Sequence, residues 1–428
     1  MTVMVLMGLT VVALLAFGFP VALVLGATGV FWTWAYDPNY MSGIAHTVFN
    51  TASGETLIAI PLFVLMGQIV QQSRVAERFY ETVARWLRFL PGGLLHANIS
   101  VSAVFSAVSG SSMATAATVA SAALNSLERL NYDRRMSTGT LAAGGTLGIL
   151  IPPSIPLIVY GSLAEESIGS LFIAALLPAV LMVSLFHAYI FIRALLNPSL
   201  APRVHGSEMT KVSMAEGLNS VLPVLAIILV VLGGIYAGWT TSTEAAALGS
   251  FMSLLAAAWQ RAVSLQMLRR VLTETVMLSG MILFIVIGAQ VFSFAVYTWG
   301  INIEIGRFVA NLAFPPLAIF GVIVLVYLVL GMFVDALSLM LMTLAVVHPI
   351  VTNLGYDPIW FGIVLVLLLE VGLITPPVGI NLFTIKAVRN DIPLSDVAFG
   401  ALPFVVIVLL TVALLVAFPQ IVLWLPFR

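Results

Sequence analysis

The chain has 428 residues, of which 61% are hydrophobic and only 8% carry a charged side chain. Soluble domains carry about 25% charged residues, so the composition excludes a soluble globular protein. The formal net charge is -1 and cysteine is absent, which excludes a basic surface for nucleic acid, disulfides and thiol catalysis. A membrane-spanning helix needs roughly 20 apolar residues, so the length accommodates about ten spans in a lipid bilayer.

The first apolar segment follows Met1 directly, with no basic stretch before it. This predicts a retained membrane segment and not a cleaved signal peptide. Further along, basic residues gather in five clusters, which the positive-inside rule assigns to the cytoplasm: 74–88, 129–135, 193–211, 261–270 and 386–389. The connections expected in the periplasm are poor in basic residues, Arg307 excepted: 37–55, 165–166, 239–244 and the segments around Glu304 and Asp357.

An amphipathic stretch runs from Gln72 to Leu90. Its apolar residues recur at helical spacing: Val75, Phe79, Val83, Trp86, Leu87 and Leu90. This pattern predicts a helix that lies along the membrane surface. A helix end projecting into the cytoplasm is the alternative.

Two segments are predicted to be re-entrant hairpins, about 92–128 and about 310–352. By the charge pattern, each leaves and returns to the same side, the first on the cytoplasmic side and the second on the periplasmic side. The run from Ser106 to Ser112 is rich in small and polar residues, which lipid would not tolerate but a protein-lined cavity would. Two ordinary spans remain the alternative for each segment.

Two further segments carry the pattern Gly-x-x-x-Pro-Pro, one starting at Gly148 and the other at Gly372. Proline removes an amide donor and clashes with the carbonyl four residues back. We therefore expect helix breaks at Pro152, Pro153, Pro376 and Pro377 within broken helices of about 136–165 and about 358–386. Freed carbonyls suit a hard cation and half-helix N-termini suit an anion. A simple proline kink is the alternative.

The two halves of the chain resemble each other. Four short matches, including the two Gly-x-x-x-Pro-Pro segments, recur in order at separations of 221 to 224 residues. The sequence thus predicts a first repeat over 1–197, a cytoplasmic linker over 198–213 and a second repeat over 214–428. The fold class is an all-α polytopic membrane protein with an inverted-topology repeat, an architecture of many secondary transporters.

Polar residues at the predicted hairpin tips are the candidates for binding. The first tip offers Ser109, Gly110, Ser111, Ser112 and Thr115. The second has Gly331, Asp335 and Ser338. An acid inside an apolar run, such as Asp335, indicates an ion ligand, a proton carrier or a hydrogen-bond acceptor, with a structural helix cap as the alternative.

Other titratable residues carry weaker signals. Glu370 is equally consistent with an ion ligand and with a residue that orients the unwound backbone. We interpret Glu244 as a structural residue near the membrane surface. The histidines lack metal-ligand spacing and are interpreted as structural or interfacial: His46, His96, His187, His205 and His348. The sequence has no phosphate-binding glycine loop, so we do not expect the chain to use ATP directly.

Four motifs in order resemble the large membrane subunit of the TRAP (tripartite ATP-independent periplasmic) transporters. They are Ser106–Ser112, Gly145–Ser154, Thr243–Ala247 and Glu370–Asn381. The resemblance covers nearly the whole chain. It implies sodium-coupled uptake of an organic acid across the bacterial inner membrane by an elevator mechanism. It also implies a periplasmic substrate-binding protein and a small four-helix membrane subunit, which we expect to be a separate chain.

The resemblance also implies site residues. One Na+ site would use the backbone of Gly331, Gly372 and Val378 and the hydroxyl of Thr375. Its symmetry mate would use Ser106, Ser109, Ser112, Gly148, Ile151 and Ser154, so two or more Na+ ions are expected. Ile151 stands where the second repeat has Thr375, so a carbonyl or a hairpin serine must replace that hydroxyl.

Substrate would contact Ser111, Ser112, Thr115, Ser154, Asp335 and Asn381. Because Asp335 would face an anion, we expect it to bind a substrate hydroxyl or to order the hairpin. Three alternatives remain open. They are a stand-alone sodium/carboxylate symporter without a binding protein, a channel, and an intramembrane enzyme. The last lacks a nucleophile–base set. A dicarboxylate, a keto acid, a sugar acid or another organic acid would all fit the sequence.

Overall fold

The computed structural model describes residues 2–73, 75–202, 214–311 and 314–427. Within these ranges the regular secondary structure is helical, and seven helices are long and apolar enough to span a membrane. Five shorter apolar helices accompany them. The all-α prediction is confirmed. Most of the predicted linker, residues 203–213, lies outside the described ranges.

The first half of the chain begins with the helices that lead to the first hairpin. These are α1 (Thr2–Ala16), α2 (Val21–Tyr36), η1 (Pro38–Tyr40), α3 (Met41–Ala52), α4 (Glu55–Gln72) and α5 (Val75–Leu87). The hairpin, the broken helix and the last span follow as α6 (Leu94–Ser109), α7 (Ser112–Arg129), α8 (Arg134–Leu150), α9 (Ile155–Ala164), α10 (Ile168–Leu196) and η2 (Pro198–Leu200).

The second half repeats this order. It begins with α11 (Met214–Tyr236), α12 (Ser242–Trp259), α13 (Leu265–Thr298) and α14 (Ile301–Ala310). It continues with α15 (Pro316–Gly331), α16 (Ala336–Asn353), α17 (Pro358–Ile374), α18 (Ile380–Val388), α19 (Leu394–Ala417) and α20 (Gln420–Leu423). Among the long helices, α13 differs from the first half in being a single helix of 34 residues, where the first half has α3 and α4, separated at Ser53 and Gly54.

The hairpins and broken helices lie close to their predicted positions. The first hairpin is α6–α7 and the second is α15–α16, which starts later than the predicted residue 310 because α14 occupies that position. The broken helices are α8–α9 and α17–α18, each interrupted at the two prolines. Both Pro-Pro peptide bonds, Pro152–Pro153 and Pro376–Pro377, are cis.

Side-chain caps fix where the second arm of each hairpin begins. Ser111 accepts a hydrogen bond from the Ala114 amide at the start of α7, and Asp335 accepts one from the Ser338 amide at the start of α16. A cap oxygen satisfies an amide that has no partner within the helix, so these residues start a new helix after each reversal.

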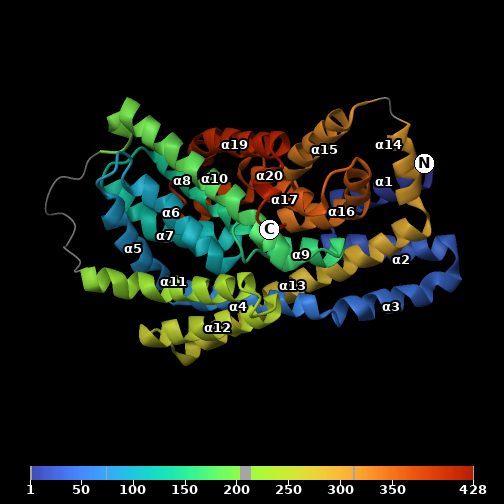
Figure 1. The fold of residues 1–428 in the computed structure, drawn as a ribbon, viewed down its shortest axis with the longest axis horizontal. Helices are drawn as coiled ribbons and strands as arrows, with labels where there is room; N and C mark the ends of the chain where they lie inside the picture. The colour runs from blue at the N-terminus through green and yellow to red at the C-terminus, as the bar shows by residue number, and fades with distance from the viewer. Residues whose placement is uncertain (1, 74, 203–213, 312–313, 428) are drawn as a thin grey trace.

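The helices form two layers (Figure 1). We call α2, α4, α12 and α13 the outer layer, in which α2 packs on α13 and α12 packs on α4. The Ser250 hydroxyl on α12 donates to the Leu62 carbonyl on α4 at 2.7 Å. Each half thus packs on the other half through the corresponding pair of helices, as an inverted repeat with a two-fold axis requires.

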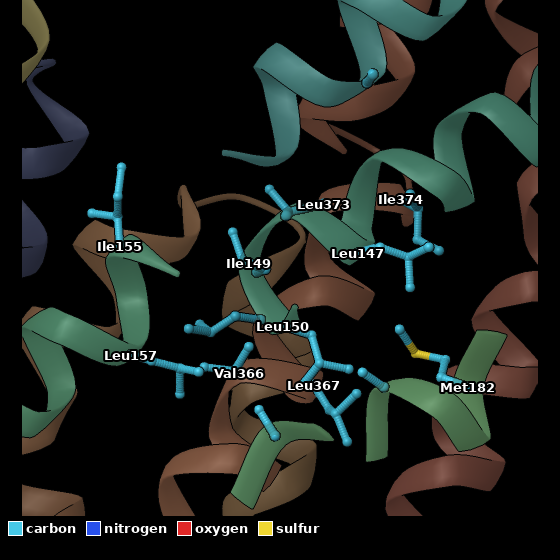
Figure 2. Close-up of a cluster of buried hydrophobic side chains, with 14 of the residues drawn as sticks. Leu147, Ile149, Leu150, Ile155, Leu157, Met182, Val366, Leu367, Leu373 and Ile374 are labelled. Atoms are coloured by element: carbon cyan, nitrogen blue, oxygen red, sulfur yellow. The ribbon is translucent and has the colours of Figure 1, made fainter. Parts of the chain in front are cut away.

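The hairpins and broken helices form the second layer, which we call the hairpin bundle. Its centre is α8 and α17, which are buried from Met136 to Leu150 and from Ile359 to Ile374. Figure 2 shows Leu147 and Leu150 of α8 packed with Leu367 of α17. Both helices are enclosed by protein over these residues, and their burial holds the two breaks side by side.

The amphipathic helix α5 differs from its prediction in what its apolar stripe contacts. Val75 and Phe79 are only 0% and 2% exposed, because α5 packs on α6, α7 and α11. Trp86 is 42% exposed at the other end. The stripe therefore binds protein along most of its length, since sequence periodicity identifies an apolar face but not its partner.

Candidate functional site

A cleft of about 850 Å³, counting its open mouth, lies between the hairpin bundle and the outer layer. Both hairpin tips reach it, the first through Ser109 to Ala114 and the second through Asp335 to Leu337. Both helix breaks contribute apolar residues. The opposite wall comes from α4 and α13, through Val64, Gly67, Gln68, Leu278, Met281 and Ile282.

The first hairpin tip is built from hydroxyls and a glycine. Gly110 has a φ of +59°, a left-handed conformation that side chains rarely adopt. The Ser109 hydroxyl lies 2.7 Å from the Thr115 hydroxyl across the turn. Ser111 and Ser112 line the cleft, and the Ser112 hydroxyl is bound to Asn381.

Each tip touches the break in its own half through main-chain atoms. A Cβ atom added at Gly148 would lie 2.6 Å from the Ser111 carbonyl oxygen, so only glycine permits this contact. In the second half, a Cβ at Gly372 would lie 2.5 Å from the Gly331 carbonyl oxygen. The Val378 amide also donates to the Met332 carbonyl at 3.2 Å. In both halves the glycine before the break meets the hairpin main chain, at the start of the second arm in the first half and at the end of the first arm in the second half.

Hydroxyl groups sit at opposite ends of the two breaks. The Thr375 hydroxyl, at the start of the second break, donates to the Val371 carbonyl at 2.6 Å. Its counterpart Ile151 has no hydroxyl, but Ser154, at the end of the first break, donates to the Ile149 carbonyl. Each break therefore has one hydroxyl bound to the last turn of the helix before it, supplied from different positions.

Asp335 lines the cleft and also caps α16. One carboxylate oxygen accepts from the Ser338 amide at 3.0 Å. The other oxygen has no hydrogen-bond partner among the described residues. The free oxygen leaves Asp335 able to accept a hydrogen bond from a molecule in the cleft.

Asn381 joins the two halves behind the cleft. Its amide nitrogen donates to the Ser112 hydroxyl at 2.7 Å and to the Ala142 carbonyl at 3.2 Å. Asn381 itself is fully buried. Asn381, near the start of α18, thus joins the first hairpin tip to the second broken helix.

Replacing Asn381 with leucine should lower the free energy of unfolding by about 1–3 kcal/mol, because it leaves buried partners without hydrogen bonds. The measurement is the melting midpoint of the purified protein in detergent. Thr384→Val is the matched control on the same helix, since that hydroxyl bonds only the Ile380 carbonyl one turn back, at 2.9 Å. Equal midpoints for the two variants would contradict a bridging role for Asn381.

The predicted site residues fall into three groups. Ser109, Ser111, Ser112 and Asp335 line the cleft. Thr115, Ser154 and Asn381 are buried behind it, and Ser106 lies deeper in α6 with its hydroxyl bound to the Ser102 carbonyl at 2.6 Å. The others lie at the breaks and their tip contacts: Gly148, Ile151, Pro152, Pro153, Gly331, Gly372, Thr375, Pro376, Pro377 and Val378.

Sequence reasoning missed the outer wall of the cleft. Gln68 is its polar member, and no local pattern in the sequence marks it. Glu370 is fully buried, and neither carboxylate oxygen has a partner among the described residues. Glu244 takes the structural role expected, in a capping box at the start of α12.

Two of the histidines meet in space, although they are distant in sequence. The Nδ1 atoms of His96 and His187 lie 2.7 Å apart, and His96 Nε2 lies 2.9 Å from the Pro91 carbonyl. Among the described residues no group of three or more His, Cys, Asp or Glu side chains could hold a metal ion. The pair instead links α6 to α10.

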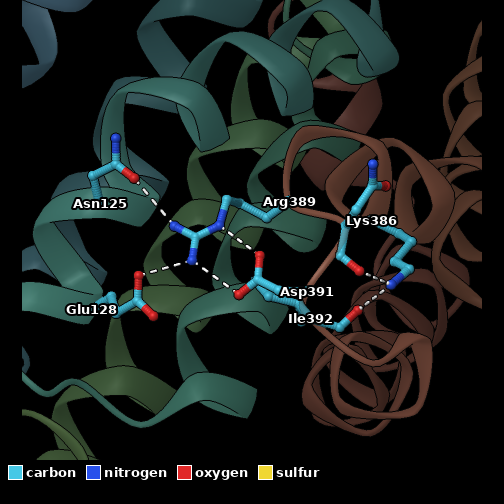
Figure 3. A network of polar contacts seen from close by, with 7 residues as sticks. Asn125, Glu128, Lys386, Arg389, Asp391 and Ile392 are labelled. Carbon is cyan, nitrogen blue, oxygen red and sulfur yellow. Dashed lines mark hydrogen bonds and ion pairs between the residues drawn. The ribbon is translucent and has the colours of Figure 1, made fainter.

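A polar network ties the first hairpin to the second broken helix on the predicted cytoplasmic side (Figure 3). Arg389, after α18, donates to Glu128 at 2.8 Å and to Asn125 at 3.1 Å, both on α7. It also forms an ion pair with Asp391 at 2.8 Å. Hydrogen bonds from Arg389 lower the pKa of the Asp391 carboxyl to about 2.

Replacing Arg389 with glutamine should speed hydrogen exchange in the last turn of α7, because the hairpin loses its link to α18. Exposed ion pairs are screened by salt, so the difference from wild type should shrink at 1 M NaCl. Because the pKa of Asp391 is lowered, its carboxylate stabilises the position of Arg389 above about pH 4. This stabilisation is lost as the pH falls through about 2. Exchange rates unchanged at low salt would argue against the link.

Comparisons with known proteins identify relatives of the whole chain. The family model of the tripartite ATP-independent periplasmic transporter, DctM component, matches residues 9–421. The C4-dicarboxylate TRAP transporter large permease protein DctM of Pseudomonas aeruginosa is 35% identical, over 94% of this chain and 93% of the relative. The sialic acid TRAP transporter large permease protein SiaM of Vibrio cholerae is 33% identical, over 87% of this chain and 86% of the relative.

The fold has a counterpart among solved structures. The crystal structure of the Alcanivorax borkumensis YdaH transporter matches with a TM-score of 0.59, over 91% of this chain and 89% of that one. At 13% sequence identity this likeness concerns the fold alone. It agrees with the elevator-type arrangement of hairpins and broken helices.

Proposed function

The chain belongs to the DctM family of tripartite ATP-independent periplasmic transporters, and from that premise we propose that it carries out sodium-coupled uptake of an organic acid by an elevator mechanism. Family membership makes it a multi-pass permease of the bacterial inner membrane and not an enzyme. Permeases of this family work with a small permease subunit and a periplasmic binding protein. We propose that this chain receives its substrate from such a binding protein and pairs with a separate small subunit.

The observation that carries the proposal is the cleft that both hairpin tips enter, with a helix break behind each tip. Unwound backbone offers carbonyl oxygens, which coordinate Na+ in discontinuous transport helices. We assign one Na+ to the contact of Gly331 with the second break and another to the contact of the first tip with Gly148. The ions would hold the tips in the form that binds substrate.

The position of the cleft supports the elevator part of the proposal. One wall belongs to the hairpin bundle and the other to α4 and α13 of the outer layer. Movement of the bundle past a fixed outer layer would carry the substrate from one side of the membrane to the other. Substrate would contact Ser111, Ser112 and Asp335 directly, whereas Thr115, Ser154 and Asn381 would support the tip from behind.

The test is uptake by proteoliposomes that contain the chain and its small subunit, with the partner binding protein and its ligand outside. We expect uptake with an inward Na+ gradient and none when K+ replaces Na+. Undiminished uptake in K+ would remove the sodium assignment. Equal uptake without the binding protein would favour a stand-alone symporter.

A further inference from the structure

The cleft is unusual for a site that takes an organic acid, because it offers no cationic side chain. Among the described residues that line it, Asp335 is the only charged one. Its polar side chains are otherwise those of Gln68, Ser109, Ser111 and Ser112. The side chains that can bind a substrate carboxylate here are therefore neutral donors.

The two hairpin tips differ in charge. The first tip ends in uncharged serines at the start of α7, a helix of 18 residues whose N-terminal dipole favours an anion. The second tip starts α16 with Asp335, whose negative charge already occupies the equivalent position. A carboxylate is favoured at the first tip and repelled at the second, where a hydrogen-bond donor is favoured.

Gln68 supplies an independent sign that a polar ligand fits here. It is only 8% exposed, and its amide has no hydrogen-bond partner among the described residues. It lines the cleft from the outer layer. Since the rest of the residue is buried, the cleft is where a ligand or water can complete the hydrogen bonds of this amide.

The rest of the cleft is apolar. Both breaks contribute, through Ile149 and Ile155 from the first and Leu373 and Ile380 from the second. Met281 lies on the outer wall. A substrate with an apolar body would bind more tightly between such walls, by about fourfold for each buried methylene group. A polyol or a second carboxylate would find few hydrogen-bond partners there.

We infer that the substrate class of this chain is a monocarboxylate with an apolar body and one hydroxyl or amino group, and that dicarboxylates are disfavoured. This inference rests on the proposed function. The carboxylate lies at the first tip, the donor group faces the free oxygen of Asp335, and Gln68 adds a polar contact from the outer layer. Asp335 and Gln68 are thus residues that determine specificity.

The first test measures dissociation constants by calorimetry on the purified chain with its small subunit in NaCl, without a binding protein. The probes are 2-hydroxy-4-methylpentanoate, 4-methylpentanoate and malate. We expect the hydroxy acid to bind at least tenfold more tightly than either of the others. Tighter binding of malate would overturn the inference. Binding of none of the three in NaCl would count against it too.

The outcome for the proposed function is read separately, from Na+-dependent uptake with the binding protein's own ligand. Uptake of that ligand together with a preference for malate refutes the substrate class and leaves the proposed function standing. Loss of Na+-dependent uptake for that ligand refutes the proposed function itself.

Substitutions at Asp335 and Gln68 test whether these side chains determine the preference for the hydroxy acid over malate. Asp335→Asn keeps a helix-capping side chain but removes the charge, so it should shift the ratio of malate to hydroxy-acid affinity at least tenfold toward malate. Gln68→Leu should weaken hydroxy-acid binding about tenfold. Gln71→Leu is the matched control, because Gln71 lies on the same helix outside the cleft. An unchanged ratio in Asp335→Asn, or equal effects of the two glutamine variants, would contradict the assignments.

Discussion

Replacing Asp335 with alanine is expected to abolish uptake, reducing the initial rate roughly 100-fold or more, which corresponds to about 2.7 kcal/mol. Asp335 faces the cleft with one carboxylate oxygen free, so the variant removes an acceptor that substrate would use. It also removes the cap of α16, which is worth about 1 kcal/mol. The measurement is Na+-driven uptake in proteoliposomes, with insertion and monodispersity checked for each variant.

Ser167→Ala isolates the loss of a helix cap. Ser167 caps α10 by accepting from the Ser170 amide at 3.2 Å and does not line the cleft, so this variant loses a cap without removing a charge or a substrate contact. We expect it to reduce uptake, but by far less than Asp335→Ala. Wild-type uptake by Asp335→Ala would refute the role assigned to the acid, and equal losses in the two variants would reduce that role to capping.

The second large effect is expected when Gly372 or Gly148 is replaced by alanine. The added Cβ would lie 2.5 Å from the Gly331 carbonyl oxygen in one case and 2.6 Å from the Ser111 carbonyl oxygen in the other. Both obstacles are main-chain atoms, so they cannot turn away as a side chain could. Overpacking of this kind costs about 1–3 kcal/mol, which would displace the tips and reduce uptake roughly 10- to 100-fold.

Gly321→Ala is the matched control for this steric argument. Gly321 lies on α15 of the second hairpin, and a Cβ there would meet nothing within 4 Å. Alanine is the better helix former by about 1 kcal/mol, so this variant should be at least as stable as wild type. Comparable losses of uptake in Gly321→Ala and Gly372→Ala would show that the tip contact is not what alanine disturbs.

The hairpins and breaks could be predicted because their signals are local. Two prolines end a helix wherever they stand, and the serines near residue 110 cannot face lipid. The Gly-x-x-x-Pro-Pro pattern at Gly148 recurs at Gly372, which identified the two segments as equivalent parts of a repeat. Element bounds in the structure differ from the predicted ones by a few residues, with the largest shift at the start of the second hairpin.

Contacts between segments that are distant in the chain could not be predicted from the sequence. Nothing local shows that Gln68 of α4 faces the tips, or that Asn381 reaches Ser112. His96 and His187 meet only because α6 packs on α10. The stripe of α5 was visible, but Phe79 packs in protein and not in lipid, a choice that its periodicity does not encode.

The contacts between tips and breaks consist largely of main-chain atoms, as at Gly372 and Gly331 and from the Val378 amide to the Met332 carbonyl. Main-chain atoms are the same for every residue type, so these contacts persist under most substitutions at non-glycine positions. Side chains of the cleft have no such constraint. Substitutions of cleft side chains can therefore change which substrate binds while the contacts between tips and breaks stay the same.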